Sequence, residues 1–288
     1  MVLEQAFRAK WLEQRPISAL FLGLVYSIIG ILSAKLIFPA SSGLASIAFV
    51  SILLIPSLNR LLSDEENVEI RENKFSIRML FRDHRDIFEI YFFMFIGIFL
   101  AYAMFAMFLP KSLVLKMFGP QINLIKGQGL YQAFVGYAFS TEHFVEILLN
   151  NLLVFIVCLV LSIVYGAGAI FILAWNASVI AAAIGNFVRV HLSSYAAQFG
   201  MVSFANYLQI YGIGLARYFI HGIPEILSYF IGGLAGGLIG VAVIRHDFST
   251  KAFGKVMRDA IDLLLIGVAL LVVAAIVEVY ITPNVVRF

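Results

Sequence analysis

Seven stretches of mainly apolar residues constrain this chain more than any other feature of its sequence. Each is close to the 20 or so residues that a helix needs to cross a hydrocarbon core of about 30 Å. Their approximate bounds are 17–38, 42–59, 87–109, 144–164, 167–187, 224–244 and 259–281. The composition agrees, because 62% of the residues are hydrophobic and only 13% are charged. The sequence therefore predicts an all-α, polytopic bundle of transmembrane helices in a cell membrane.

Two pairs of spans are joined by short connections that contain glycine. Residues 38–43 (FPASSG) follow the first span, and residues 165–168 (YGAG) follow the fourth, so each pair should form a hairpin. Residues 60–86 are the most polar segment and should form a cytoplasmic loop. We divide the chain into an N-terminal part with three spans, residues 1–110, and a membrane domain, residues 111–288.

Lysine and arginine residues collect on one side of the predicted membrane. Most of them lie in residues 1–16, 60–86 and 245–258, and seven spans place these three segments on the same side. Cytoplasmic loops carry an excess of Lys and Arg. The N-terminus should therefore be cytoplasmic and the C-terminus outside.

Two external connections, 110–143 and 188–223, are long but rich in apolar residues. Irregular backbone at membrane depth is tolerated only where protein or water satisfies it. We therefore expect a re-entrant or interfacial helix near 204–222 and a second interfacial element at 112–125. The alternative has eight spans, with 204–222 crossing fully and the C-terminus inside.

Polar side chains form two clusters inside the apolar part of the chain, where a charge costs about 2.5–3.5 kcal/mol at mid-bilayer. Spacings of three and four residues place their members on shared helix faces. The first cluster is Glu142, His143, Glu146, Asn150 and Asn151, and the second is Arg217, His221 and Glu225. Both lie at the external ends of their spans, so we expect them to meet. Asn176, within the fifth span, should form a hydrogen bond to another helix.

Three interpretations of these clusters stay open. In the first, the charges neutralise one another, with Arg217 paired to Glu142, Glu146 or Glu225 and His221 bound to Asn150 or a carboxylate. A divalent metal such as zinc is a second interpretation, with His143, Glu146, His221 and Glu225 as ligands. A proton or ion pathway is the third.

Glycines recur at small-xxx-small spacing in the sixth span, a pattern that allows helices to approach closely in lipid. They are Gly232, Gly233, Gly236, Gly237 and Gly240. This face should pack within the fold or form the contact of a homo-oligomer.

Several classes of function lack support in the sequence. Cys158 is the only cysteine, so neither a disulfide nor a zinc–thiolate framework is expected. Phosphate-binding loops, dinucleotide fingerprints and hydrolase triads are not recognisable. The net charge of +3 gives no reason to expect nucleic-acid binding. We therefore favour a non-enzymatic role.

Two stretches resemble the stage II sporulation protein M family of integral membrane proteins. Residues 150–185 contain an N-N start, a G-x-G turn and an asparagine in the following span, and residues 221–240 begin with H-G-x-x-E before a small-residue span. The resemblance assigns family positions to six residues: Asn150, Asn151, Asn176, His221, Gly222 and Glu225. It lies in the C-terminal half, and residues 1–110 look like an addition.

The resemblance implies a scaffold that organises partner proteins, because the family's namesake recruits cell-wall hydrolases during engulfment in spore-forming bacteria. Lipid, a second copy of the chain, and membrane or extracytoplasmic proteins are the expected partners. The alternatives are an ion- or solute-translocating protein that uses the Glu/His/Arg cluster and a metal-dependent intramembrane hydrolase.

Overall fold

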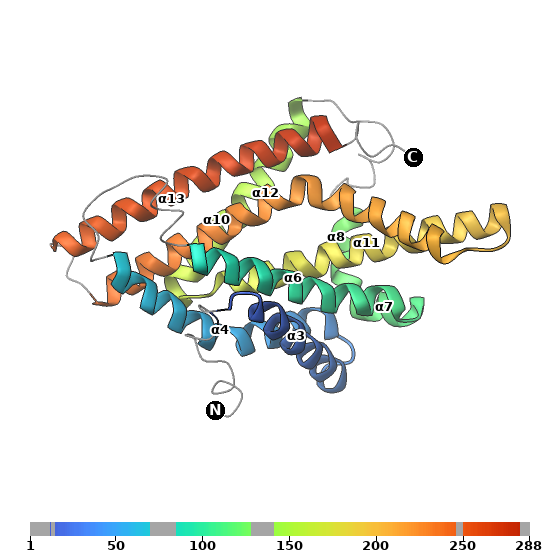
Figure 1. The fold of residues 1–288 in the computed structure, drawn as a ribbon, viewed down its shortest axis with the longest axis horizontal. Helices are drawn as coiled ribbons and strands as arrows, with labels where there is room; N and C mark the ends of the chain where they lie inside the picture. Colours follow the sequence, from blue (N-terminus) through green and yellow to red (C-terminus); the bar gives the residue numbers. More distant parts are fainter. Residues whose placement is uncertain (1–11, 13–14, 70–84, 128–140, 246–249, 283–288) are drawn as a thin grey trace.

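The computed structural model describes residues 12, 15–69, 85–127, 141–245 and 250–282, and these form a bundle of long helices (Figure 1). In chain order the helices are α3 (Ser18–Ile37), α4 (Ser42–Glu69), α6 (Arg85–Phe108), α7 (Lys111–Met117), α8 (Gly119–Gly127), α10 (Thr141–Tyr165), α11 (Ala169–Phe199), α12 (Phe204–Arg245) and α13 (Lys251–Ile276), which continues as the π-helical turn η1 (Val277–Ile281). The short helices α7 and α8 occupy the segment for which an interfacial element was expected.

Seven helices within the described residues are long and apolar enough to cross a membrane, which confirms the predicted all-α, polytopic bundle. The two predicted hairpins are also present. The α3–α4 connection occupies residues 38–41, and the α10–α11 connection occupies residues 166–168. Gly166 has a φ of 70°, a left-handed conformation that glycine adopts without steric cost. Most of the predicted polar loop, residues 60–86, lies outside the described residues.

Two of the three N-terminal spans, α3 and α6, approach each other closely enough for direct backbone contact. Gly23 of α3 lies against the carbonyl of Met94, and Gly97 of α6 lies against the carbonyl of Leu20. A side chain at either glycine would separate the two helices. These reciprocal contacts explain why α6 can lie flat against α3.

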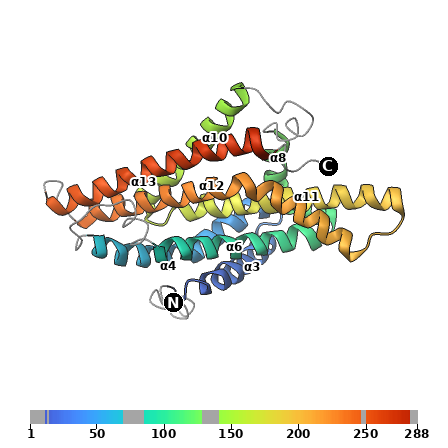
Figure 2. The same ribbon diagram turned by 45° about the horizontal axis from the view of Figure 1, so that its top comes forward.

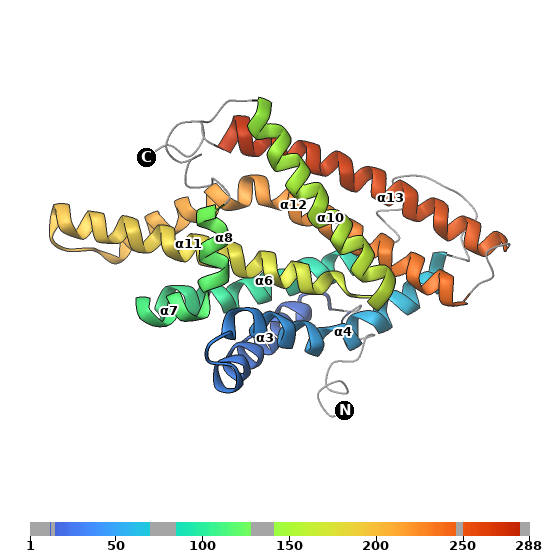
Figure 3. The ribbon, with the colours of Figure 1, turned by 180° about the vertical axis from the view of Figure 1, so that it is seen from behind.

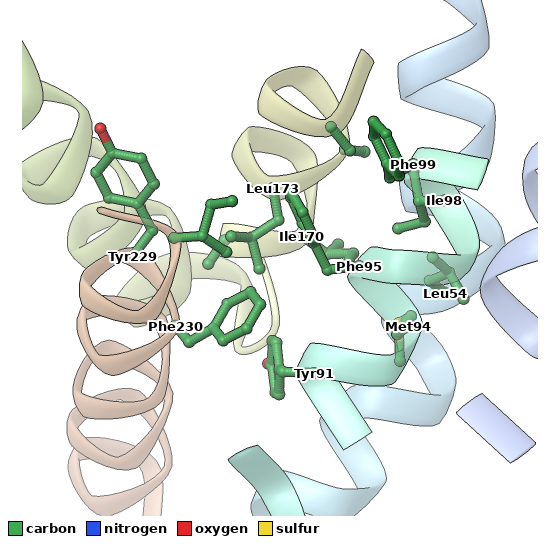
Figure 4. Close-up of a cluster of buried hydrophobic side chains, with 14 of the residues drawn as sticks. Leu54, Tyr91, Met94, Phe95, Ile98, Phe99, Ile170, Leu173, Tyr229 and Phe230 are labelled. Atoms are coloured by element: carbon green, nitrogen blue, oxygen red, sulfur yellow. The ribbon is translucent and has the colours of Figure 1, made fainter. Parts of the chain in front are cut away.

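Helix α11 joins the N-terminal helices to the rest of the bundle, because it packs against both α6 and α12. The resulting hydrophobic core is continuous, and the side chains labelled in Figure 4 come from α4, α6, α11 and α12. Leu54 of α4, Phe95 of α6, Ile170 of α11 and Phe230 of α12 are each at most 2% exposed. The core thus crosses the predicted boundary at residue 110.

Helix α12 differs from its prediction. Residues 204–222 are not a separate re-entrant element but the first half of one helix that runs to Arg245. Pro224 lies inside this helix without ending it, because neighbouring helices support both halves and proline is tolerated in such packed membrane helices. The α11–α12 hairpin projects beyond the other helices in Figures 1 and 2. We call the end of the bundle that carries this projection the hairpin end.

Helix α10 crosses the bundle obliquely (Figure 3). Its C-terminal end lies against the start of α11, where residues 166–168 connect the two helices. Its N-terminal end lies away from α11 and stands clear of the other helices in Figure 2.

Candidate functional site: a polar cavity behind helix α10

A cavity of about 470 Å³ lies where α10 diverges from α11 and α12. Side chains from α8, α10, α11, α12 and η1 line it. Its polar and aromatic lining residues are His143, Glu146, Asn150, Asn151, Trp175, Asn176, Tyr218, His221, Glu225, Tyr229 and Glu278. The rest of its wall is mainly aliphatic, including Leu153, Val157, Ile172 and Val179. We refer to this space as the α10 cavity.

The register of α11 and α12 places Asn176 opposite Glu225. Gly233 of α12 packs against Ala169 of α11, and the two helices are joined by a short turn, so they run antiparallel. Eight residues before Gly233 stands Glu225, and seven residues after Ala169 stands Asn176. At a rise of 1.5 Å per residue the two side chains therefore lie at nearly the same depth.

Glu278 reaches the same depth from the last helix. Thr282 Oγ1 lies 3.4 Å from His221 Nδ1, which sets the register of η1 against α12. Glu225 stands one turn beyond His221, and Glu278 stands one turn before Thr282. This register places Glu225 and Glu278 on facing helices at the same depth, and both line the α10 cavity.

Asn151 completes a layer to which four helical segments contribute. Gly232 of α12 packs against the ring of Phe155, and Asn151 stands one turn before Phe155 on α10. We call Asn151, Asn176, Glu225 and Glu278 the polar layer. All four line the α10 cavity.

Hydrogen bonds fix several of these side chains. Tyr229 donates its hydroxyl to Glu225 at 2.8 Å, and Figure 4 shows this ring at the edge of the hydrophobic cluster. Asn176 donates to the carbonyl of Ile172 in its own helix at 2.9 Å, instead of to another helix as expected. Thr282 donates to the carbonyl of Val277 at 3.1 Å, so a hydrogen bond between His221 and Thr282 requires the proton on His221 Nδ1.

Asn151 has an unsatisfied donor. The residue is only 5% exposed, and its Oδ1 accepts a hydrogen bond from Asn150 at 3.4 Å. Its Nδ2 has no hydrogen-bond partner in the part of the chain that the structure describes. A buried amide donor without an acceptor costs about 1–3 kcal/mol, so this atom calls for an acceptor that the described residues do not supply.

Most of the residues expected to form the site line the α10 cavity, and Arg217 and Glu142 are the two exceptions. Arg217 is absent from the cavity lining. Glu142 belongs to the first turn of α10, and its side chain lies outside the described residues. His143 Nδ1 and Glu146 Oε2 are 3.8 Å apart, the pairing that their spacing of three residues favours. His221 contacts Thr282 and not the expected Asn150 or carboxylate.

The expected metal ligands do not converge on one point. In residues 15–69, 85–127, 141–245 and 250–282, no group of three or more His, Cys, Asp or Glu side chains is placed to hold a metal ion. The His143–Glu146 pair belongs to α10, where Glu146 is 77% exposed, whereas His221 and Glu225 belong to α12.

The glycine stripe of α12 packs within the chain. Gly232 and Gly233 lie against Phe155 and Ala169, and Gly236 and Gly240 lie against backbone carbonyls of α10. Gly237 is buried as well. This packing brings α10 and α12 together directly below the polar layer, so it closes the α10 cavity on the side away from the hairpin end.

Sequence reasoning did not assign Glu278, Trp175, Tyr218 and Tyr229 to the site. Glu278 has a recognisable signal, because an acidic residue within an apolar span marks a functional site by default. The aromatic residues carry no such signal, since 14% of the chain is aromatic.

Comparisons with known proteins agree with the motifs. The family model SpoIIM, described as Stage II sporulation protein M, matches residues 19–283. This range includes the three N-terminal spans, which the motifs alone did not connect with the family. No curated protein and no solved structure matched the chain.

Proposed function

This chain belongs to the stage II sporulation protein M family, and from that premise we propose that it is a membrane scaffold that organises partner proteins. The observation that carries the proposal is the projecting α11–α12 hairpin. Helix α12 has 42 residues and α11 has 31. Their lengths of about 63 Å and about 46 Å exceed a hydrocarbon core of about 30 Å.

The tip of this hairpin is both ordered and apolar. Ser203 and Asn206 cap the start of α12. The backbone N–H of Asn206 donates to Ser203 Oγ, and the backbone N–H of Ser203 donates to Asn206 Oδ1. Large apolar side chains beside the cap are exposed. They include Phe199 at 60%, Met201 at 85% and Phe204 at 75%. Apolar groups held outside the hydrocarbon core favour contact with another protein.

Photocrosslinking in native membranes tests the scaffold. A photoreactive amino acid at Met201 or Phe204 should give discrete adducts with a second protein. The matched control is Leu265 of α13, which is 65% exposed within a predicted span and should react with lipid. Replacing both Phe199 and Phe204 by Glu should abolish the adducts without changing the amount of protein in the membrane.

Self-association is part of the same proposal, and the adducts distinguish it from binding of other proteins. A homo-oligomer would give adducts at twice the mass of the chain. The glycine stripe is already occupied by α10, so an oligomer would have to use another face. The scaffold is rejected if positions 201 and 204 react only with lipid and pull-down returns neither a partner nor a second copy.

Translocation of an ion or solute is a second candidate, favoured by the two carboxyl groups of the polar layer. Glu225 and Glu278 lie inside predicted spans, and such residues often mark ion or proton pathways. Proteoliposome flux should then be lost in Glu225→Gln and in His221→Ala. A wild-type protein that conducts nothing above empty liposomes removes this candidate.

A further inference from the structure

We propose that the α10 cavity binds an amphiphile with an ammonium group: the ammonium lies at the polar layer, and the apolar remainder lies along α10. This inference does not depend on the proposed scaffold, because the cavity lies among α10, α11, α12 and η1 and does not include the hairpin tip.

The size and shape of the cavity suit an organic molecule. One water occupies about 30 Å³ in the liquid, so a cavity of about 470 Å³ is far larger than a dehydrated metal ion requires. Its lining residues on α10 run from His143 to Val157. That distance is about 21 Å along a helix, somewhat more than one leaflet of the hydrocarbon core.

The charge of the cavity selects a cation. Among the described residues that line it, there are three glutamates and no Lys or Arg. No ion pair to Glu225 or Glu278 is present in the described part of the chain. Two neighbouring carboxyl groups inside a membrane need a positive partner or a proton, and an ammonium group supplies the partner.

Aromatic side chains favour an organic ammonium over a bare metal ion. Trp175, Tyr218 and Tyr229 all line the cavity. The faces of aromatic rings attract ammonium groups, and cages of such rings recognise alkylated amines. Together with the carboxyl groups they form a suitable lining for this class of ligand.

The unsatisfied amide of Asn151 points to a second polar group on the ligand. Its Nδ2 is buried and has no acceptor in the described part of the chain, although the residue lines the cavity. A phosphate or ester oxygen next to the ammonium would accept this hydrogen bond. A zwitterionic lipid headgroup carries both groups a few bonds apart.

Access to the cavity is from the side of α10. Leu153 is 61% exposed and Val157 is 36% exposed, although both line the cavity. On the opposite side from the hairpin end, Gly236 and Gly240 bring α12 against α10 and close the space. The cavity is therefore a blind pocket that a molecule enters from the surrounding membrane.

Native mass spectrometry of the purified full chain in detergent tests the proposal. The protein is incubated with an equimolar mixture of phosphatidylethanolamine and phosphatidylglycerol, which differ in the ammonium group. We expect occupancy by phosphatidylethanolamine to exceed that by phosphatidylglycerol about tenfold, as a charged hydrogen bond would give. A parallel arm adds free ethanolamine to separate the lipid from a soluble amine as the source of the ammonium group.

Matched variants assign the effect to the cavity. Glu225→Gln combined with Glu278→Gln should remove the preference for phosphatidylethanolamine, and the side-chain amide introduced at position 225 can still accept the hydrogen bond from Tyr229. Asn151→Leu should weaken binding of the lipid more than binding of ethanolamine, because ethanolamine offers only a neutral hydroxyl oxygen as acceptor and lacks the charged phosphate. Asp262→Asn, an acid-to-amide change in α13 outside the cavity lining, is the control and should change nothing.

Each outcome decides the proposal. Selective phosphatidylethanolamine binding that ethanolamine does not displace identifies a lipid ligand, and displacement by ethanolamine identifies an amine as sufficient. Equal occupancy by the two lipids, no bound amphiphile, or a preference that survives both glutamate substitutions overturns the proposal. If the double variant fails to fold, the headgroup preference of the wild-type protein still decides.

Discussion

Gly236 is the residue whose replacement should most directly separate α10 from α12. A Cβ at this position would overlap the backbone carbonyl of Leu159, which cannot move without displacing α10. We expect Gly236→Ala to reduce the free energy of unfolding by about 1–3 kcal/mol, the usual cost of overpacking. Thermal unfolding of the purified protein in detergent measures the effect.

Gly212→Ala is the matched control in the same helix. Nothing lies within 4 Å of a Cβ at Gly212, and alanine favours a helix over glycine by about 1 kcal/mol. This variant should be unchanged or slightly more stable. Equal behaviour of the two variants would contradict the close approach of α10 and α12.

Single residues also show what the sequence could predict about the site. His143, Glu146, Asn150 and Asn151 follow one another closely on α10, so helical spacing alone groups them. Glu278 joins Glu225 only because α13 runs antiparallel to α12 in one register. That register depends on packing, and no local pattern in the sequence encodes it.

At the scale of elements, Asn59 ties α4 to the turn between α10 and α11. Its Oδ1 accepts a hydrogen bond of 2.5 Å from the amide of Ala167, beside the positive φ of Gly166. Asn59→Ala leaves this amide unsatisfied and should cost about 1–3 kcal/mol, whereas Asn59→Asp keeps the acceptor and should cost less. Thermal unfolding measures the difference, with Asn186→Ala at an exposed position as the control. Similar losses of stability in Asn59→Ala, Asn59→Asp and Asn186→Ala would contradict the role of this hydrogen bond.

Arg189 should be the residue that fixes the end of α6 against α11. Its guanidinium donates to the carbonyls of Ala106, Met107 and Leu109, the last carbonyls of α6 and the residue that follows it. Arg189→Met removes all of these donors, whereas Arg189→Lys keeps one ammonium that cannot reach three carbonyls at once. The rate of proteolysis in detergent should therefore be lowest for the wild type, higher for Arg189→Lys and highest for Arg189→Met. Equal rates would argue against the contact between Arg189 and the end of α6.

The elements differ in how far their sequences predict them. The hairpin turns at residues 38–41 and 166–168 follow from the length of the apolar stretches and from their turn residues, which are Pro39 in the first turn and Gly166 and Gly168 in the second. The continuity of α12 does not, because Gly222 and Pro224 are typical of a helix boundary. Packing of α12 between α10, α11 and α13 overrides that local preference.

For the molecule as a whole, an odd number of spans places the two termini on opposite sides of the membrane. The described part of the chain has seven candidate spans, and the excess of Lys and Arg in residues 1–16, 60–86 and 245–258 predicts that the N-terminus is cytoplasmic. On this prediction the hairpin tip faces outward, and an amphiphile enters the α10 cavity from the outer leaflet. Cysteine labelling with a membrane-impermeant maleimide in intact cells measures this orientation.

The chain suits this experiment because its only cysteine, Cys158, is buried and should not react. Met201→Cys at the hairpin tip should be labelled in intact cells, since Met201 is 85% exposed. Lys251→Cys at the start of α13 should be labelled only after the membrane is permeabilised. Labelling of position 251 but not of position 201 in intact cells would show that the chain has the opposite orientation. An amphiphile would then reach the α10 cavity from the cytoplasmic leaflet, and the partners of the hairpin would be cytoplasmic.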